Sequence, residues 1–180
     1  RFTKKTASLV EAFTESISFD QRLYKYDIEG SIAHASMLAQ CNLITRRECG
    51  TIIKGLRGIH KEIESGTFQF KMEREDIHMN IESALIERIG DVAKKLHTAR
   101  SRNDQIALDL RLWMRDQIQE IIETIIALQS EFIVQAKTAD NNILPGFTHL
   151  QHAQPVMAGH YFLAYVEMLE RDRTRLGDCR

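Results

Sequence analysis

The apolar positions of this chain recur mostly at intervals of three and four residues, which is the spacing of one face of an α-helix. No segment shows sustained alternation of apolar and polar residues, and no Asn-Gly or Asp-Gly turn joins β-branched runs. The only prolines, Pro145 and Pro155, stand close together late in the chain, so the rest is free of the strongest helix breaker. The pattern predicts an all-α fold.

Several helices are bounded by recognisable start and stop signals. We expect a short helix near 7–14 within an otherwise irregular, basic lead over 1–20. Asp20 is expected to cap a helix over 21–41, in which Gly30 is a weak point. The run Thr45-Arg46-Arg47-Glu48 is a capping box that opens a helix through about Glu64, ended by Ser65-Gly66. A further helix is expected between a cap at Asp76 and a stop at Gly90.

The clearest predicted element begins near Ser101, because no Gly or Pro occurs from there to Leu144. About 40 helical residues make a rod of roughly 60 Å. Its apolar seam is wide, which favours a helical bundle over a two-stranded coil; the seam comprises Met114, Ile118, Ile121, Ile125, Leu128, Phe132 and Ala139, widened by Ile122, Ile126 and Ile133. The segment 145–155 is expected to be a loop, with Pro155 in the first turn of a last helix. We therefore expect an N-terminal helical domain over 1–100 and the first part of a central bundle over 101–180.

Composition narrows the classes of function. Lys and Arg number 24 against 25 Asp and Glu, a net charge of −1, which gives no general attraction to nucleic acid. No apolar run is long enough to cross a membrane, and residues 1–6 have no apolar stretch of a secretory signal behind them. Cys41, Cys49 and Cys179 are odd in number and lack metal-binding spacing, so we expect reduced thiols and a cytoplasmic location.

The stretch His97–Gln105 gathers two arginines, two hydroxyls, two amides and a carboxylate at the start of the long helix. The first N–H groups of a helix lack partners within it, and the helix dipole adds positive charge there. Arg100 and Arg102 bring planar forks that suit carboxylate or phosphate. Ser101 and Asp104 have the spacing of a capping pair, so the stretch is either an anion-binding site or a solvated helix cap.

Further polar clusters occur at Ser16–Arg22, at His78–Asn80 and at Thr148–Gln154. The pair His149 and His152 has no accompanying carboxylate, so the sequence does not favour a metal there. A glycine-rich phosphate loop is absent from the sequence. Capture of carboxylates followed by proton transfer fits these residue types best. His78 and His149 remain open between a functional and a structural role, and a structural role is the simpler interpretation of His34, His60 and His160.

Several blocks resemble the argininosuccinate lyase family of the fumarase/aspartase superfamily, and they occur in family order along essentially the whole chain. They are Ser16-Ile17-Ser18-Phe19-Asp20-Gln21-Arg22-Leu23, Asp27-Ile28-Glu29-Gly30-Ser31, Glu75-Asp76-Ile77-His78, Leu96 to Gln105, and Pro145 to Pro155. The resemblance implies a homotetramer around a shared bundle of long helices, with each active site built from three subunits. It also implies cleavage of argininosuccinate into arginine and fumarate, without cofactor or metal.

The resemblance implies roles for individual residues. Matching positions make Ser16, Asp20, His78, Arg102, Asn103 and Gln151 substrate-binding residues. Thr148 and His149 match catalytic positions, His149 as acid/base or as the support of that group.

Two parts of the family pattern are absent: the Gly-Ser-Ser loop with its catalytic serine and following lysine, and the Trp-Gly-Gly that precedes Arg-Phe. The resemblance therefore implies an N-terminal portion that binds substrate and does not complete turnover alone. A sibling lyase acting on adenylosuccinate, fumarate or aspartate stays open as an alternative. So do a non-catalytic relative like the delta crystallins and a helical scaffold whose polar clusters are caps.

Overall fold

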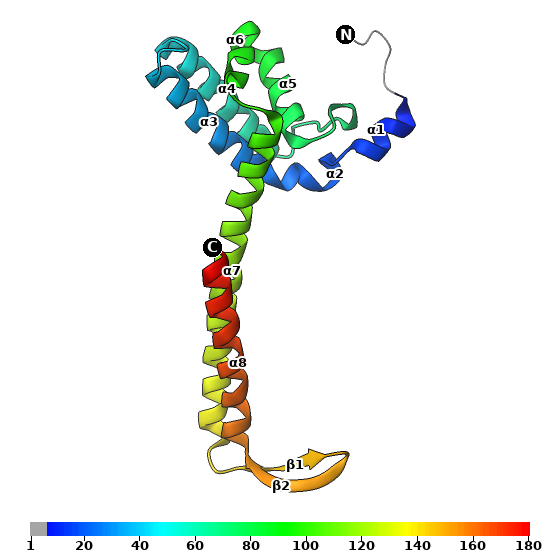
Figure 1. The fold of residues 1–180 in the computed structure, drawn as a ribbon, viewed down its shortest axis with the longest axis vertical. Coiled ribbons are helices and arrows are strands. Elements are labelled where there is room, and N and C mark those ends of the chain that lie inside the picture. The colour runs from blue at the N-terminus through cyan, green and yellow to red at the C-terminus, as the bar shows by residue number, and fades with distance from the viewer. Residues whose placement is uncertain (1–6) are drawn as a thin grey trace. The chain divides into compact units, whose positions relative to one another are not determined.

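A computed structural model describes residues 7–180, and the prediction of an all-α fold is confirmed apart from one two-stranded sheet (Figure 1). The chain divides into two compact units, the first ending at Trp113 and the second comprising Met114–Arg180. We call them unit 1 and unit 2. Residues 1–6, part of the expected irregular lead, lie outside the described residues. No helix over residues 7–180 is long and apolar enough to cross a membrane.

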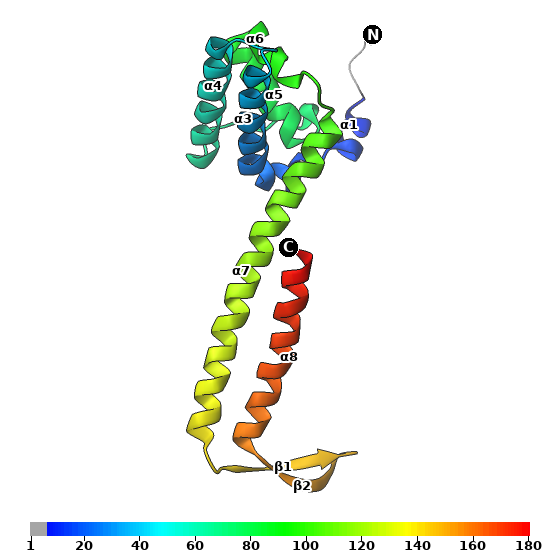
Figure 2. The same cartoon turned by 60° about the vertical axis from the view of Figure 1, so that its left-hand side comes forward.

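Unit 1 consists of short helices and 3-10 turns around three longer helices. Its elements are α1 (Ser8–Thr14), α2 (Ile17–Asp20), η1 (Gln21–Leu23), α3 (Tyr24–Gln40), α4 (Arg46–Glu64), η2 (Met72–Arg74), α5 (Ile77–Ile89), α6 (Asp91–Lys94), η3 (Lys95–His97) and the first turns of α7 (Arg102–Ala139). Figure 2 shows α3, α4 and α5 side by side. Their facing stripes form the core, in which Leu38, Ile52, Leu56, Ile59 and Leu85 are fully buried.

The predicted capping signals of α4 and α5 are confirmed. At the start of α4, the Glu48 N–H donates to Thr45 Oγ1 at 3.2 Å, and the Thr45 N–H donates to Glu48 Oε2 at 2.8 Å. At the start of α5, the Met79 N–H donates to Asp76 Oδ1 at 2.8 Å. These bonds satisfy amide groups that have no partner inside the helix.

The expectation that Asp20 caps the helix following it is wrong. No side-chain bond from Asp20 caps η1, and α3 begins only at Tyr24. Asp20 Oδ1 instead accepts the Ile77 N–H at 3.1 Å, so it caps the distant helix α5. A capping bond depends on proximity in space, and here the fold supplies that proximity.

Gly30 was expected to weaken α3, and its packing explains why glycine occupies that position. An added Cβ would lie 3.1 Å from Leu108 Cδ2 and 3.2 Å from Gln105 Nε2, both on the first turns of α7. The absence of a side chain therefore allows α7 to pack closely against α3.

Unit 2 contains the rest of α7, a hairpin of β1 (Ile143–Thr148) and β2 (Gln151–Met157), and α8 (Ala158–Cys179). Both views show α8 running back beside α7 (Figures 1 and 2). The ring of Phe132 on α7 stacks with Phe162 and Tyr165 on α8, with centroids 6.2 and 5.7 Å apart. Two helices cannot bury the wide seam, and apolar side chains such as Ile121, Ile126, Leu128, Val134, Leu163 and Met168 stay exposed.

The prediction of a loop over 145–155 is wrong, because this segment forms an antiparallel hairpin in which Pro145 pairs with Pro155. A sheet of only two strands has edges on both sides, where a residue without an N–H is tolerated. Pro155 consequently lies in β2, and α8 begins at Ala158. Near the bulge, a Cβ on Gly146 would lie 2.6 Å from the Gln154 carbonyl oxygen, so only glycine fits.

Candidate functional site

The starts of α2 and α5 are joined by a compact set of hydrogen bonds. Ser16 Oγ donates to Asp20 Oδ2 at 2.6 Å, and Asp20 in turn accepts the Ile77 N–H. The Ser16 and Ile17 amides donate to the Glu75 carbonyl oxygen at 2.8 and 2.9 Å. Burial raises the pKa of Asp20, and the bonds from Ser16 and Ile77 oppose that change. The carboxylate is thus held at a helix N-terminus by donors from two elements.

Arg102 brings the first turn of α7 to the same place. Its Nη1 donates to Glu75 Oε2 at 2.9 Å, and its Nε lies 3.4 Å from Asp76 Oδ2. The bond to Glu75 raises the pKa of Arg102, so the guanidinium is firmly charged. The guanidinium predicted to bind substrate carboxylate is paired with protein carboxylates in this structure.

The predicted capping pair at the start of α7 forms. The Ser101 N–H donates to Asp104 Oδ2 at 2.8 Å, while Ser101 Oγ accepts the Asn103 N–H at 3.2 Å. Asn103 itself is exposed on the first turn, next to Arg102. The interpretation of the stretch His97–Gln105 as a helix cap is thus confirmed, and Asn103 faces solvent.

His78 is buried in the first turn of α5, beside Asp27 of α3. His78 Nδ1 lies 2.8 Å from Asp27 Oδ2, and both side chains are at most 2% exposed. An ionised carboxylate only accepts, so the Nδ1–H donates. His78 is predicted to bind substrate, and one of its ring nitrogens is thus already hydrogen-bonded to the buried Asp27.

A buried polar network, which the sequence analysis did not identify, continues from Asp27. Gln105 Nε2 donates to the Asp27 carbonyl oxygen at 3.1 Å and to Asp109 Oδ1 at 2.9 Å. Arg100 donates to Gln105 and to Ser31, and burial lowers the pKa of this guanidinium. Burial, reinforced by the charge of Asp27, raises the pKa of Asp109 to about 9. Asp109 is therefore mostly protonated at neutral pH.

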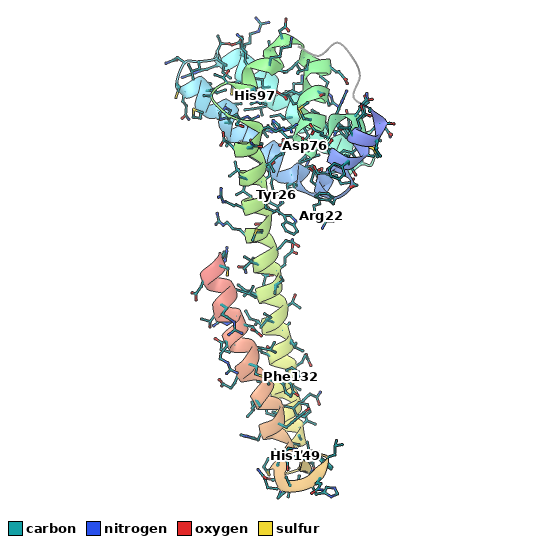
Figure 3. The ribbon with its side chains drawn as sticks, turned by 45° about the vertical axis from the view of Figure 1, so that its right-hand side comes forward. Arg22, Tyr26, Asp76, His97, Phe132 and His149 are labelled. Atoms are coloured by element: carbon teal, nitrogen blue, oxygen red, sulfur yellow. The ribbon has the colours of Figure 1, made fainter. Side chains whose placement is uncertain are left out.

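Thr148, His149 and Gln151 occupy the hairpin of unit 2. Thr148 pairs with Gln151, and His149 and Leu150 form the turn with φ of 53° and 64°. Positive φ at both central residues is the geometry of a type I′ hairpin turn, which disfavours bulky side chains. His149 is exposed at this tip, as Figure 3 shows. An exposed histidine in a turn of this shape is available to a ligand or to another chain.

The predicted site residues thus fall into two groups. Within unit 1, Ser16, Asp20 and Arg102 gather at the start of α5, with Asn103 beside Arg102 and His78 in the first turn of α5. Figure 3 shows Asp76 and His97 in the same unit. Thr148, His149 and Gln151 form the second group, on the hairpin. Among the described residues, His78, Glu82 and His97 are the one group with the spacing of metal ligands.

Comparisons with known proteins identify the family to which the chain is similar. The family model described as Lyase matches residues 1–180. An argininosuccinate lyase of Syntrophus aciditrophicus is 58% identical over 179 residues, which are 99% of this chain and 38% of that protein. One of Alkaliphilus metalliredigens is 56% identical over 99% of this chain and 39% of its own length. The chain thus spans about two fifths of these relatives.

Solved structures show the same fold. EDDS lyase, determined in complex with formate and as a variant with bound fumarate, is 27% identical, with a TM-score of 0.77 over 98% of this chain and 35% of that chain. A fumarate lyase from Mesorhizobium sp. BNC1 is 22% identical, with a TM-score of 0.73 over 99% of this chain and 41% of its own.

Proposed function

This chain belongs to the lyase family, and from that premise we propose that its protein cleaves argininosuccinate to arginine and fumarate. The observation that carries the proposal is the identity of 58% and 56% with argininosuccinate lyases over 99% of the chain. A sibling lyase of the fumarase or adenylosuccinate lyase type is the alternative, with a crystallin-like relative beyond it.

The proposed reaction is a β-elimination. A base takes a proton from the carbon next to a carboxylate, and the electron pair of that C–H bond passes onto the carboxylate, giving an aci-carboxylate. This electron pair forms the new double bond as the C–N bond breaks, and the C–N electron pair leaves with the guanidinium nitrogen, which takes up a proton. Negative charge accumulates on the carboxylate in the transition state, so donors aimed at it supply much of the rate acceleration.

Residue roles follow the two groups of the candidate site. We assign substrate binding to Ser16, Asp20, His78, Arg102, Asn103 and Gln151, and the catalytic roles to Thr148 and His149. The exposure of Asn103 and His149, one on a helix start and one at a hairpin tip, supports these roles. The proposed elimination requires neither a metal nor a cofactor.

The proposed assembly is a cytoplasmic homotetramer in which copies of the chain contribute to one another's active sites. The exposed apolar side chains of α7 and α8 support an assembly in which further helices cover this seam. The free thiols of Cys41, Cys49 and Cys179 support the reducing location. Native mass spectrometry of the whole protein should give four copies, and a monomer would contradict the assembly.

The test of the activity is fumarate release by the whole protein, measured separately with argininosuccinate and adenylosuccinate. We expect turnover of argininosuccinate, with Asn103→Leu and His149→Asn each slower by about 10²–10³, the usual cost of losing a transition-state donor. His160→Asn, at an exposed position of α8, is the matched control and should keep the parent rate. Turnover of adenylosuccinate alone would favour the sibling lyase, and normal rates in both site variants would overturn the residue assignments.

A further inference from the structure

We propose that His78, Glu82 and His97 form a binding site for a divalent transition metal of the Zn²⁺ class. One ligand atom from each side chain lies within 4.8 Å of those of the other two. His78 and Glu82 stand one turn apart on α5, and His97 comes from η3. Two histidines and a glutamate that leave a fourth position open are an established zinc ligand set.

The state of His78 points to a ligand. Its Nδ1 is bonded to Asp27, which leaves Nε2 as the nitrogen free to bind a metal. That Nε2 is buried and has no hydrogen-bond partner within residues 7–180, in a side chain only 2% exposed. A buried nitrogen without a partner carries a desolvation cost. A metal ion bound to Nε2 would remove that cost.

Asp27 supplies the supporting contact that metal-bound histidines commonly have. Its carboxylate accepts the Nδ1–H of His78 at 2.8 Å, which fixes the ring tautomer so that the Nε2 lone pair is available. Such a carboxylate–histidine pair orients the ligand and raises its basicity. The carboxyl groups of Asp27 and Glu82 also provide negative charge that balances the cation. The nearby guanidinium of Arg100 is the positive charge that they must offset as well.

The other two proposed ligands, Glu82 and His97, lie close enough together to bind the same ion. His97 Nδ1 is already 3.3 Å from Glu82 Oε1. Zinc bonds of about 2.0–2.1 Å place tetrahedral ligands about 3.4 Å apart. His78 is held by its bond to Asp27, whereas Glu82 and His97 are 23% and 43% exposed. Small rotations of these two side chains would complete the geometry.

The consequence for catalysis rests on the proposed function. His78 is a proposed substrate-binding residue, and a nitrogen bound to metal is withdrawn from any other contact. Zn²⁺ should therefore inhibit the lyase reaction, and His97→Gln should relieve that inhibition.

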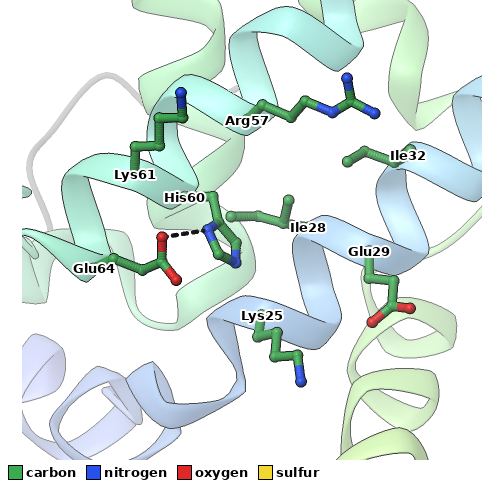
Figure 4. Close-up of a pocket in the computed structure, with 8 residues that line it drawn as sticks. All are labelled: Lys25, Ile28, Glu29, Ile32, Arg57, His60, Lys61 and Glu64. Carbon is green, nitrogen blue, oxygen red and sulfur yellow. Dashed lines mark ion pairs between the residues drawn. The ribbon is translucent and has the colours of Figure 1, made fainter.

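The chain contains a matched control on α4. His60 and Glu64 form another i, i+4 pair, with His60 Nδ1 3.2 Å from Glu64 Oε2. Figure 4 shows this pair at an open pocket of about 370 Å³ between α3 and α4. Within the described part of the chain, no third ligand joins it. His60→Gln therefore removes a histidine–carboxylate pair of the same spacing without touching the proposed site.

The experiment is calorimetric titration of the metal-free whole protein with Zn²⁺. We expect one Zn²⁺ per chain to be lost in Glu82→Gln and in His97→Gln but retained in His60→Gln. Asp27→Asn should weaken that site by about 10–100-fold, the typical effect of an outer partner. Unchanged stoichiometry and affinity in both ligand variants, with circular dichroism confirming that they fold, would overturn the proposal.

The two proposals fail in different ways. Turnover of argininosuccinate without Zn²⁺ binding would overturn the metal site alone. Zn²⁺ binding that depends on Glu82 and His97, in a protein without lyase activity, would support the metal site and overturn the proposed function. Binding at this site that leaves turnover unchanged would overturn the inhibition.

Discussion

His78 and Asp27 face each other in the interior of unit 1, with His78 Nδ1 2.8 Å from Asp27 Oδ2. The pair lies beside a second buried carboxyl group, that of Asp109, which bonds to Gln105. Two carboxylates cannot both remain charged at low cost in such surroundings. Asp109 therefore retains its proton.

Replacing Asp109 with Asn should flatten the pH dependence of stability. The pKa of Asp109 is raised from 3.8 to about 9, so the folded state keeps a proton that the unfolded chain releases. The contribution of Asp109 to the free energy of unfolding therefore falls as pH rises from about 4 to about 9, by at most about 1.4 kcal/mol per pH unit. Asn resembles the protonated acid and cannot ionise.

Denaturant unfolding of the parent and of Asp109→Asn across this pH range provides the measurement. Asp178→Asn, at an exposed position of α8, is the matched control and should follow the parent. Parallel curves for the parent and Asp109→Asn would contradict a buried, protonated Asp109.

The charge of Asp27 is the second largest cause of the raised Asp109 pKa, so Asp27→Asn should lower that pKa. Burial, the largest cause, remains, and the pKa should stay above its ordinary value. The carboxyl carbon of Asp109 reports its titration in carbon-detected NMR. A midpoint that stays near the parent value in the variant would show that the two carboxyl groups do not interact.

The local signals of this chain could be predicted, and its distant pairings could not. The capping box of Thr45 and Glu48 lies within one turn, so its spacing specifies the bond. Asp20 looked like a local cap, but its partner Ile77 is 57 positions away, and only the fold brings them together. The bond of His78 to Asp27 spans 51 positions in the same way.

The hairpin and the metal ligands show the same limit of sequence reasoning. In the hairpin, two prolines face each other across the strands. Its turn is formed by His149 and Leu150 and lacks the glycine that normally marks a hairpin. The spacing of His149 with His152 and that of His78 with Glu82 are both visible in the sequence. The pair of His78 and Glu82 acquires its third ligand, His97, from a separate element.

Gly30→Ala should destabilise unit 1, although alanine is the better helix former. The new Cβ would lie 3.1 Å from Leu108 Cδ2 and 3.2 Å from Gln105 Nε2, so α7 or these side chains must shift. Gly50→Ala on α4 is the matched control, because nothing lies within 4 Å of its Cβ position. The control should gain about 0.5–1 kcal/mol of stability. Urea unfolding measures both, and an equal gain in Gly30→Ala would refute the close approach of α3 and α7.

Thr45→Ala should cost about 0.5–2 kcal/mol of unfolding free energy, the usual loss for an N-cap side chain. The substitution removes Oγ1, which accepts the Glu48 N–H, and leaves that amide without its protein partner. Thr45→Ser keeps the oxygen and should recover most of the stability. Thr51→Ala serves as the control on the same helix, because Thr51 Oγ1 bonds back to the Arg47 carbonyl at 3.0 Å instead of capping an amide. Such back-bonding slightly destabilises helices, so the control should be neutral or stabilising. If Thr45→Ala lost no more free energy of unfolding in urea than Thr51→Ala, the capping box would contribute nothing to the stability of α4.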